Sequence, residues 1–126
     1  MIWRWLPSLA WMGFIFWSSA QEGPSDFPVP DYLSHFVVYG ILASLYFFAL
    51  IATSLAAVGR FLVGMVLTAS YGWSDELHQS LVPGRDPSAV DLAVDTLAAI
   101  CALGIWELAS RGRLRLASKK ATDEPA

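Results

Sequence analysis

An apolar run over residues 61–73 ends directly in the polar string Ser74-Asp75-Glu76-Leu77-His78-Gln79. A run this apolar lies in lipid or in a protein interior, where an ionised side chain costs roughly 2.5–3.5 kcal/mol even on the lowest scales. The polar face must therefore turn toward a helix bundle or a wet cavity. Helical spacing places on that face Thr68, Tyr71, Gly72, Asp75, His78 and Gln79, with Glu76 at its flank.

Four apolar segments predict an all-α integral membrane protein, a bundle of four transmembrane helices. The 126 residues are 56% hydrophobic and 15% charged, which is typical of a single membrane domain. Each segment approaches the roughly 20 residues that cross the hydrocarbon core of a bilayer. The expected spans are residues 2–20, 34–58, 61–82 and 89–108. We expect a membrane domain over residues 1–110 and a basic cytoplasmic tail over residues 111–126 that is disordered at its end.

Local signals mark several ends of these segments. Pro30-Asp31 is a helix start, and residues 83–87 predict a tight turn in which Gly84 can adopt a positive φ. Ser88 and Asp91 have the spacing of a capping box, in which two residues satisfy each other's backbone N–H groups at a helix start. The fourth helix is therefore expected to begin beside this turn.

The first segment allows two interpretations. Arg4, the apolar stretch and the small residues Ser18-Ser19-Ala20 have the order of a secretory signal with its cleavage site. Three tryptophans and Pro7 make a poor signal core, which favours a retained first span. The sequence leaves open whether residues 1–20 are retained or cleaved.

The lysines and arginines divide seven to one between the two sides of a four-span chain. The positive-inside rule places the richer side in the cytoplasm. We therefore expect both termini in the cytoplasm, a multi-pass location in the plasma membrane, and Arg85 on the outer side. Glu107, near the cytoplasmic side, is expected to be an interfacial charge. The seven cytoplasmic residues are Arg4, Arg60, Arg111, Arg113, Arg115, Lys119 and Lys120.

Three predicted spans bring polar groups to the outer side. The second carries Asp31, His35 and Tyr39 at four-residue steps, and the fourth carries Asp91 and Asp95, also four apart. Because buried polar groups are least costly when they satisfy one another, these residues predict one outward-facing pocket. The expected pocket and binding residues are Asp31, His35, Tyr39, Asp75, Glu76, His78, Gln79, Arg85, Asp91 and Asp95.

The residue types leave the chemistry of this pocket open. Asp75, His78 and Gln79 could bind a metal or a phosphate-bearing lipid, perform acid–base chemistry, or form a structural polar network. The candidates for a catalytic role are Asp75, His78 and Arg85. Arg85 is either an anion clamp or the internal counter-ion of the carboxylates, and the excess of carboxylates favours the counter-ion.

Two further acidic residues are distinguished by their position. The capping-box spacing explains Asp91 without any chemistry, whereas Asp95 lies one turn deeper, which favours a pocket role. Glu76 points about 100° away from Asp75 on a helix. It is therefore expected to face a different neighbour, for which Ser18-Ser19 of the first span is a candidate.

The number of carboxylates limits the charge that the pocket can hold. Like charges disfavour joint ionisation of Asp75, Glu76, Asp91 and Asp95 beside a single arginine. We expect either that a proton is shared among them or that a cation is bound. No cofactor motif is evident, and a divalent cation of unassigned identity remains an option.

The polar motifs described above, together with Phe16-Trp17 and Pro83-Gly84-Arg85, occur in an order that resembles the VanZ-like family of small membrane proteins. The resemblance implies a membrane protein associated with low-level teicoplanin resistance, a phenotype rather than a reaction. Tyr32 and Asp95 depart from the family, which commonly has lysine and asparagine at these positions. The matching pieces are Phe16-Trp17-Ser18-Ser19, Asp31 with His35-Phe36 and Tyr39, Ser74-Asp75-Glu76-x-His78-Gln79, Pro83-Gly84-Arg85, and Asp91.

Three classes of function follow. We expect first a resistance-type binding protein whose pocket engages a lipid-linked envelope precursor or a lipoglycopeptide such as teicoplanin. The alternatives are a membrane enzyme acting on a polyprenyl-phosphate or phospholipid head group, and a proton- or cation-coupled carrier. Four spans would make a carrier an oligomer. Membrane lipids are the expected partners, and the net charge of −3 provides no basic surface for nucleic acid.

Overall fold

The computed structural model describes residues 2–21 and 30–123. These residues form helices without any strand, which confirms the all-α class. A short 3-10 turn, η1, leads directly into the first α-helix. The elements are η1 (Ile2–Trp5), α1 (Leu6–Ser19), α2 (Asp31–Leu50), α3 (Ala57–Gln79) and α4 (Ala89–Asp123).

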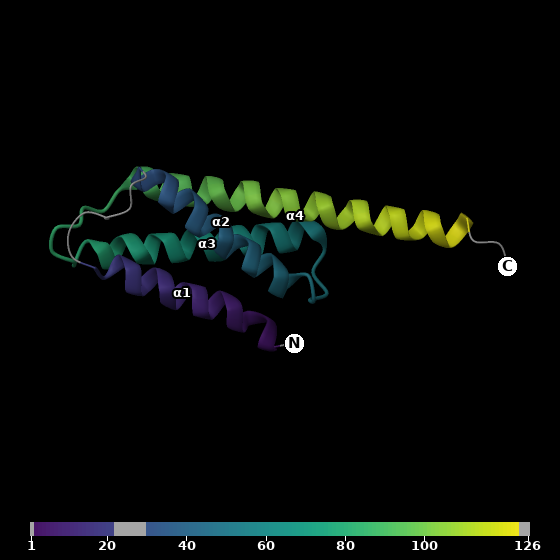
Figure 1. The fold of residues 1–126 in the computed structure, drawn as a ribbon, viewed down its shortest axis with the longest axis horizontal. Coiled ribbons are helices and arrows are strands. Elements are labelled where there is room, and N and C mark those ends of the chain that lie inside the picture. The colour runs from purple at the N-terminus through teal and green to yellow at the C-terminus, as the bar shows by residue number, and fades with distance from the viewer. Residues whose placement is uncertain (1, 22–29, 124–126) are drawn as a thin grey trace.

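The four α-helices form an elongated bundle (Figure 1). α4 packs along both α2 and α3, and α1 covers α2 and α3. The start of α1 and the end of α4 point toward the same end of the bundle (Figure 1). The turn between α3 and α4 lies at the other end, which we call the polar end because the predicted pocket residues gather there.

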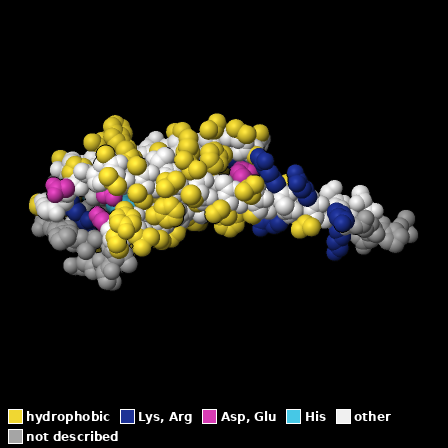
Figure 2. Space-filling model, turned by 90° about the horizontal axis from the view of Figure 1, so that it is seen from above, with side chains coloured by type: hydrophobic (Ala, Val, Ile, Leu, Met, Phe, Trp, Pro, Cys, Tyr) yellow, Lys and Arg dark blue, Asp and Glu magenta, His cyan; other side chains and the backbone are white. Residues whose placement is uncertain are grey.

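The outer surface of the bundle is strongly apolar (Figure 2). Trp17 is 62% exposed, Val90 66% and Ile105 65%. Among the described residues, buried polar and charged side chains are nearly as numerous as buried hydrophobic ones. A large contiguous apolar surface around a partly polar interior is the arrangement expected in contact with lipid or another apolar partner.

Two helices are long and apolar enough to cross a membrane, namely α2 and residues 89–120 of α4. α1 has only 14 residues, and α3 carries Arg60 near its start and Asp75 and Glu76 near its end. The structure therefore supports two of the four expected spans by length and composition.

The half of the bundle away from the polar end has an apolar core. Leu42 and Leu103 are fully buried there, in contacts that join α2 to α4. A Cβ atom at Gly64 would lie 2.9 Å from Cδ2 of Leu103, so a larger residue there would displace this buried leucine. Most of the buried ionisable groups therefore lie in the opposite half, at the polar end, and the buried Glu107 is the exception among the described residues.

The ends of α2 and α3 differ from the expected spans, and α3 runs from Ala57 to Gln79 instead of over residues 61–82. α2 begins at Asp31 as predicted but ends at Leu50 instead of Val58, because the N–H and hydroxyl groups of Thr53 both bond to the Leu50 carbonyl oxygen, at 2.9 and 2.6 Å. The turn before α4 has φ 78° at Gly84, which confirms the expected positive φ.

The basic segment after Leu108 is a continuation of α4, which reaches Asp123. The segment lacks glycine and proline apart from Gly112, so nothing in its sequence stops the helix. Its side chains from Arg111 to Lys120 are exposed. The expected disorder at the end of the tail falls on residues 124–126, which lie outside the described residues.

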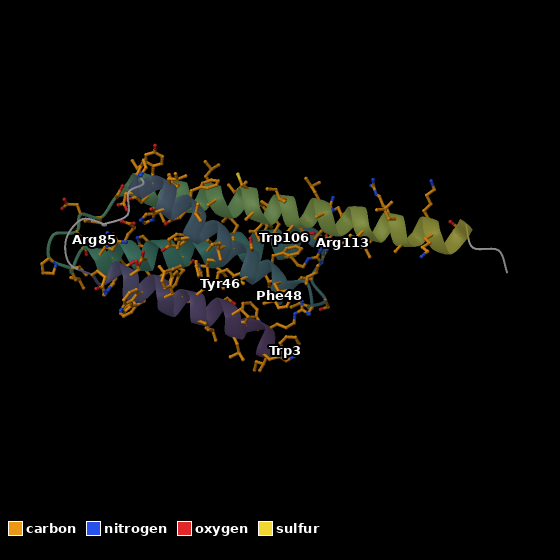
Figure 3. The ribbon with its side chains drawn as sticks, in the orientation of Figure 1. Trp3, Tyr46, Phe48, Arg85, Trp106 and Arg113 are labelled. Atoms are coloured by element: carbon orange, nitrogen blue, oxygen red, sulfur yellow. The ribbon has the colours of Figure 1, made fainter. Side chains whose placement is uncertain are left out.

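The basic residues lie at the end of the bundle opposite the polar end, except for Arg85. Figure 3 shows Arg85 at one end, and Trp3 and Arg113 toward the other. Arg4 donates to the Phe48 carbonyl oxygen from Nη2 at 2.7 Å and from Nε at 3.0 Å. This distribution matches the seven-to-one division of the sequence.

The sequence predicts that Glu107 is an interfacial charge, but the structure places it in a buried ion pair. Its side chain is buried, and its two carboxylate oxygens accept hydrogen bonds from Nε and Nη2 of Arg60, both at 2.8 Å. Arg60 also donates to the Leu55 carbonyl oxygen at 2.9 Å. This bidentate ion pair joins α3 to α4 far from the predicted pocket.

Candidate functional site

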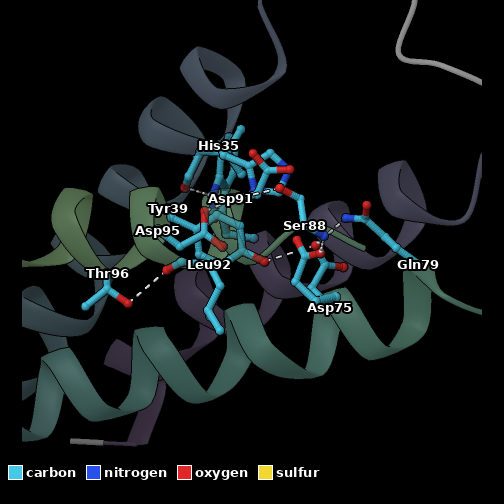
Figure 4. A network of polar contacts seen from close by, with 12 residues as sticks. His35, Tyr39, Asp75, Gln79, Ser88, Asp91, Leu92, Asp95 and Thr96 are labelled. Atoms are coloured by element: carbon cyan, nitrogen blue, oxygen red, sulfur yellow. Dashed lines mark hydrogen bonds and ion pairs between the residues drawn. The ribbon is translucent and has the colours of Figure 1, made fainter. Parts of the chain in front are cut away.

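The polar end contains the ten predicted pocket residues, on α2, α3, α4 and the turn between α3 and α4. Figure 4 labels six of them: His35, Tyr39, Asp75, Gln79, Asp91 and Asp95. Eight of the ten lie among the converging faces of α2, α3 and α4. His78 and Arg85 have their contacts elsewhere. The eight are Asp31, His35, Tyr39, Asp75, Glu76, Gln79, Asp91 and Asp95.

Asp75 links α3 to α2. Its Oδ2 accepts hydrogen bonds from the Tyr39 hydroxyl at 3.0 Å and from Nε2 of Gln79 at 3.1 Å. Asp75 is 5% exposed and Tyr39 is 1% exposed. Gln79 follows Asp75 by one helical turn, so the α3 backbone itself sets this contact. Two neutral donors thus hold a buried carboxylate in one orientation.

His35 links α2 to α4. Its Nδ1 lies 3.0 Å from Oδ1 of Asp95, a side chain with no exposed surface. The ring of His35 also stacks on that of Tyr39, with centroids 5.8 Å apart. A Cβ atom at Gly72 would come within 2.8 Å of Oδ2 of Asp95. α3 therefore closes over this carboxylate only because residue 72 has no side chain.

Glu76 connects α3 to the start of α4. Its Oε2 accepts a hydrogen bond from the Ser88 N–H at 2.7 Å. The expectation that Glu76 faces Ser18-Ser19 is therefore wrong. Ser88 in turn caps α4, because its Oγ accepts the Asp91 N–H at 3.2 Å.

The capping box predicted for Ser88 and Asp91 is thus only half formed. In such a box the Asp91 carboxylate would accept the Ser88 N–H. Glu76 accepts it instead. Capping therefore does not explain the carboxylate of Asp91, which is 9% exposed beside the other polar-end residues.

His78 faces α1 and not the converging polar faces. Its ring stacks on Phe16, with centroids 4.4 Å apart and planes inclined by 24°. Nε2 of His78 is buried without a hydrogen-bond partner among the described residues. Sequence spacing placed His78 on the face of Asp75, but the ring stacking directs it to another neighbour.

Arg85 lies at the edge of the polar end. Its Nε donates to the Gln21 carbonyl oxygen at 3.3 Å. Within residues 2–21 and 30–123, the ion pairs are His35 with Asp95 and Arg60 with Glu107. Arg85 is thus not the counter-ion of the buried carboxylates in this structure. It lines a cleft between α1 and α2.

No family model, curated protein or solved structure matches the chain. The resemblance to VanZ-like proteins therefore depends on the motif residues, above all those from Asp75 to Arg85.

A cleft of about 340 Å³ separates the second half of α1 from the first half of α2. Its walls are mainly apolar, and its inner surface presents carboxylate, imidazole, hydroxyl and amide groups. Six predicted residues line it: Asp31, His35, Tyr39, Asp75, Gln79 and Arg85. No sequence signal identifies the apolar wall residues, because the packing of α1 decides which apolar side chains face the cleft. These wall residues are Phe14, Ile15, Leu33, Val37 and Val38.

The polar end can also hold a cation. Its carboxylates at Asp75, Glu76, Asp91 and Asp95 are each at most 9% exposed. Two sets of residues offer ligand atoms within 4.8 Å of one another: His35, Glu76 and Asp95, and Asp31, His35 and Asp91. His35 belongs to both sets.

Proposed function

We propose that this chain is a four-span protein of the plasma membrane with both termini in the cytoplasm. The apolar outer surface, the two helices long enough to span, and the clustering of basic residues at one end support this proposal. In this orientation the polar end and its cleft face outward. α1 with η1, and α3, would then be the remaining two spans.

We further propose that the protein is VanZ-like and binds a lipid-bearing molecule of the cell envelope, either an envelope lipid or a lipoglycopeptide. The cleft between α1 and α2 is the observation that carries this proposal, because it joins apolar walls to a polar inner surface. Such a cleft suits an amphipathic ligand, whose acyl chain lies along the walls while its polar group reaches Asp75 and His35.

The side chains restrict the polar group of the ligand. The Asp75 and Asp31 carboxylates accept hydrogen bonds, so they favour amine, amide or hydroxyl groups. Arg85, also on the cleft, can bind a phosphate or carboxylate. A molecule with hydroxyl or amine groups, an anionic group and a long hydrocarbon chain therefore fits the cleft best. Lipoglycopeptides and lipid-linked envelope precursors have this combination.

Antibiotic susceptibility tests this function. Expression should protect cells against teicoplanin more than against vancomycin, which has no acyl chain for the cleft to hold. Asp75→Asn and Arg85→Ala should lose the protection at unchanged protein level. Val37→Trp, which narrows the cleft at its apolar wall, should also lose the protection, without any change in charge.

Asp86→Asn is the matched control, because Asp86 is an exposed carboxylate on the same turn as Arg85 and does not line the cleft. It should protect like the wild type. If all three cleft variants are well expressed and protect fully, the cleft has no part in resistance. Turnover of a labelled envelope lipid by the purified protein would favour the enzyme instead, and proton or cation flux in sealed vesicles would favour the carrier.

A further inference from the structure

The polar end has more buried negative charge than its basic groups can balance. Asp75, Glu76, Asp91 and Asp95 are all buried, and His35 is the only residue that forms an ion pair with any of them in the described part of the chain. Even a charged His35 would leave an excess of carboxylates. Unpaired buried charge is costly, so either protons or a bound cation must compensate for it.

Two carboxylate oxygens indicate where that compensation is needed. Oε1 of Glu76 and Oδ2 of Asp95 are buried and have no hydrogen-bond partner among the described residues. Glu76 is 7% exposed and Asp95 is 0% exposed. In each group the second oxygen is already engaged, with the Ser88 N–H or with His35. Buried acceptors without a partner are rare in native proteins and point to an ion or a proton at the site.

The geometry brings these two carboxylates to one imidazole. His35 on α2, Glu76 on α3 and Asp95 on α4 offer ligand atoms within 4.8 Å of one another. Figure 4 shows two of them, His35 and Asp95, side by side. We propose that His35, Glu76 and Asp95 bind a divalent transition-metal cation that ties the three helices together at the polar end. This site shares His35 with the cleft, whereas Glu76 and Asp95 do not line it, and metal binding does not require the ligand proposed for the cleft.

The donor set narrows the identity of the metal. One imidazole nitrogen and two carboxylates suit Zn²⁺ or Mn²⁺, whereas Mg²⁺ and Ca²⁺ prefer sites made only of oxygen. Asp91, whose carboxylate lies near the same imidazole, is available as a further ligand or an outer partner. In the metal-free arrangement a proton lies between His35 and Asp95. A ligand must give up such protons to bind the metal, so the affinity should fall as the pH is lowered.

Metal analysis of the purified full chain is the first test. Protein extracted in mild detergent without chelator should carry about one Zn²⁺ or Mn²⁺ per chain by mass spectrometry. After chelator treatment, calorimetric titration with Zn²⁺ and with Mn²⁺ should restore binding with one site. Wild-type protein that carries neither metal and takes up neither on titration would overturn the proposal.

Ligand variants locate the site. His35→Gln, Glu76→Gln and Asp95→Asn should each lower the affinity at least ~10-fold, because each removes or weakens one ligand. His78→Gln provides a matched control, since this second histidine stacks on Phe16 outside the cluster. If all three ligand variants bind the metal as tightly as the wild type, or if only His78→Gln loses affinity, the assignment is contradicted.

A spectroscopic measurement keeps the test independent of folding. Electron spin-echo spectra of Mn²⁺-loaded wild type should show coupling to one imidazole nitrogen. If this coupling is absent, His35 is not a ligand. Infrared spectra test the alternative that protons compensate the charge of the buried carboxylates. A protonated carboxyl band that persists at saturating Zn²⁺ would support this alternative and contradict the metal site. Neither readout uses antibiotic susceptibility, so each can fail while the cleft proposal stands.

Discussion

Nδ1 of His35 lies 3.0 Å from Oδ1 of Asp95, across a sequence separation of sixty residues. The contact joins the first half of α2 to the first half of α4, and Asp95 has no exposed surface there. A buried charge loses its hydration, so each partner becomes costly when the other is removed. His35 and Asp95 are therefore expected to act as a pair in the stability of the bundle.

A double-mutant cycle at this pair should show strong coupling. His35→Ala and Asp95→Ala should each destabilise the bundle, while the double variant should lose less than the sum of the two, by about 1–3 kcal/mol. Unfolding by denaturant in mixed micelles, with metal removed by chelator, measures this difference. Purely additive losses would mean that the 3.0 Å contact contributes no specific stability.

Gly72 should be intolerant of even a methyl group. A Cβ atom there would meet Oδ2 of Asp95 at 2.8 Å, and that carboxylate cannot move without leaving His35. Gly72→Ala should therefore cost about 1–3 kcal/mol, the usual penalty for overpacking.

Gly104→Ala is the comparison for this substitution. Gly104 also lies within a helix, but a Cβ atom at that position has no neighbour within 4 Å. The same change should stabilise α4 there by about 0.5–1 kcal/mol, because alanine is the better helix former. Thermal unfolding of both variants in one detergent would test the contrast, and equal shifts would argue against close approach at Gly72.

The Arg60–Glu107 pair should stabilise the end of the bundle opposite the polar end. Glu107→Ala would leave the Arg60 guanidinium with only the Leu55 carbonyl oxygen as its described partner. A loss of roughly 3 kcal/mol is expected, at the low end for breaking a buried ion pair. Arg60→Met combined with Glu107→Leu should recover most of it, because both charges are then absent. Thermal unfolding that is unchanged in Glu107→Ala would show that water or lipid head groups replace the pair.

Single-cysteine labelling should give the orientation of the bundle. In a Cys101→Ser background, Asp86→Cys should react with a membrane-impermeant reagent from outside the cell, and Ser118→Cys should react only after lysis. Both residues are exposed at opposite ends of the structure. The reverse pattern would place the polar end in the cytoplasm and remove the basis for an outward-facing cleft.

Much of the candidate site could be predicted from sequence periodicity. Four-residue spacing identified Asp31, His35 and Tyr39 on one face, and Asp91 with Asp95 on another, because a helix repeats its direction nearly every fourth residue. Proline, glycine and serine marked the start of α2 and the turn before α4 for equally local reasons. The helices and the inward polar faces thus follow from interactions within a few residues.

The partners of those side chains were decided only by the tertiary structure. Glu76 bonds to Ser88 instead of Ser18-Ser19, and His78 stacks on Phe16. Periodicity fixes the direction of a side chain around its own helix, but it does not fix how far one helix is rotated or shifted against the next. That relation depends on close approach, as at Gly72 against Asp95. Packing between distant segments therefore determined which carboxylates have partners, and which two oxygens have none within residues 2–21 and 30–123.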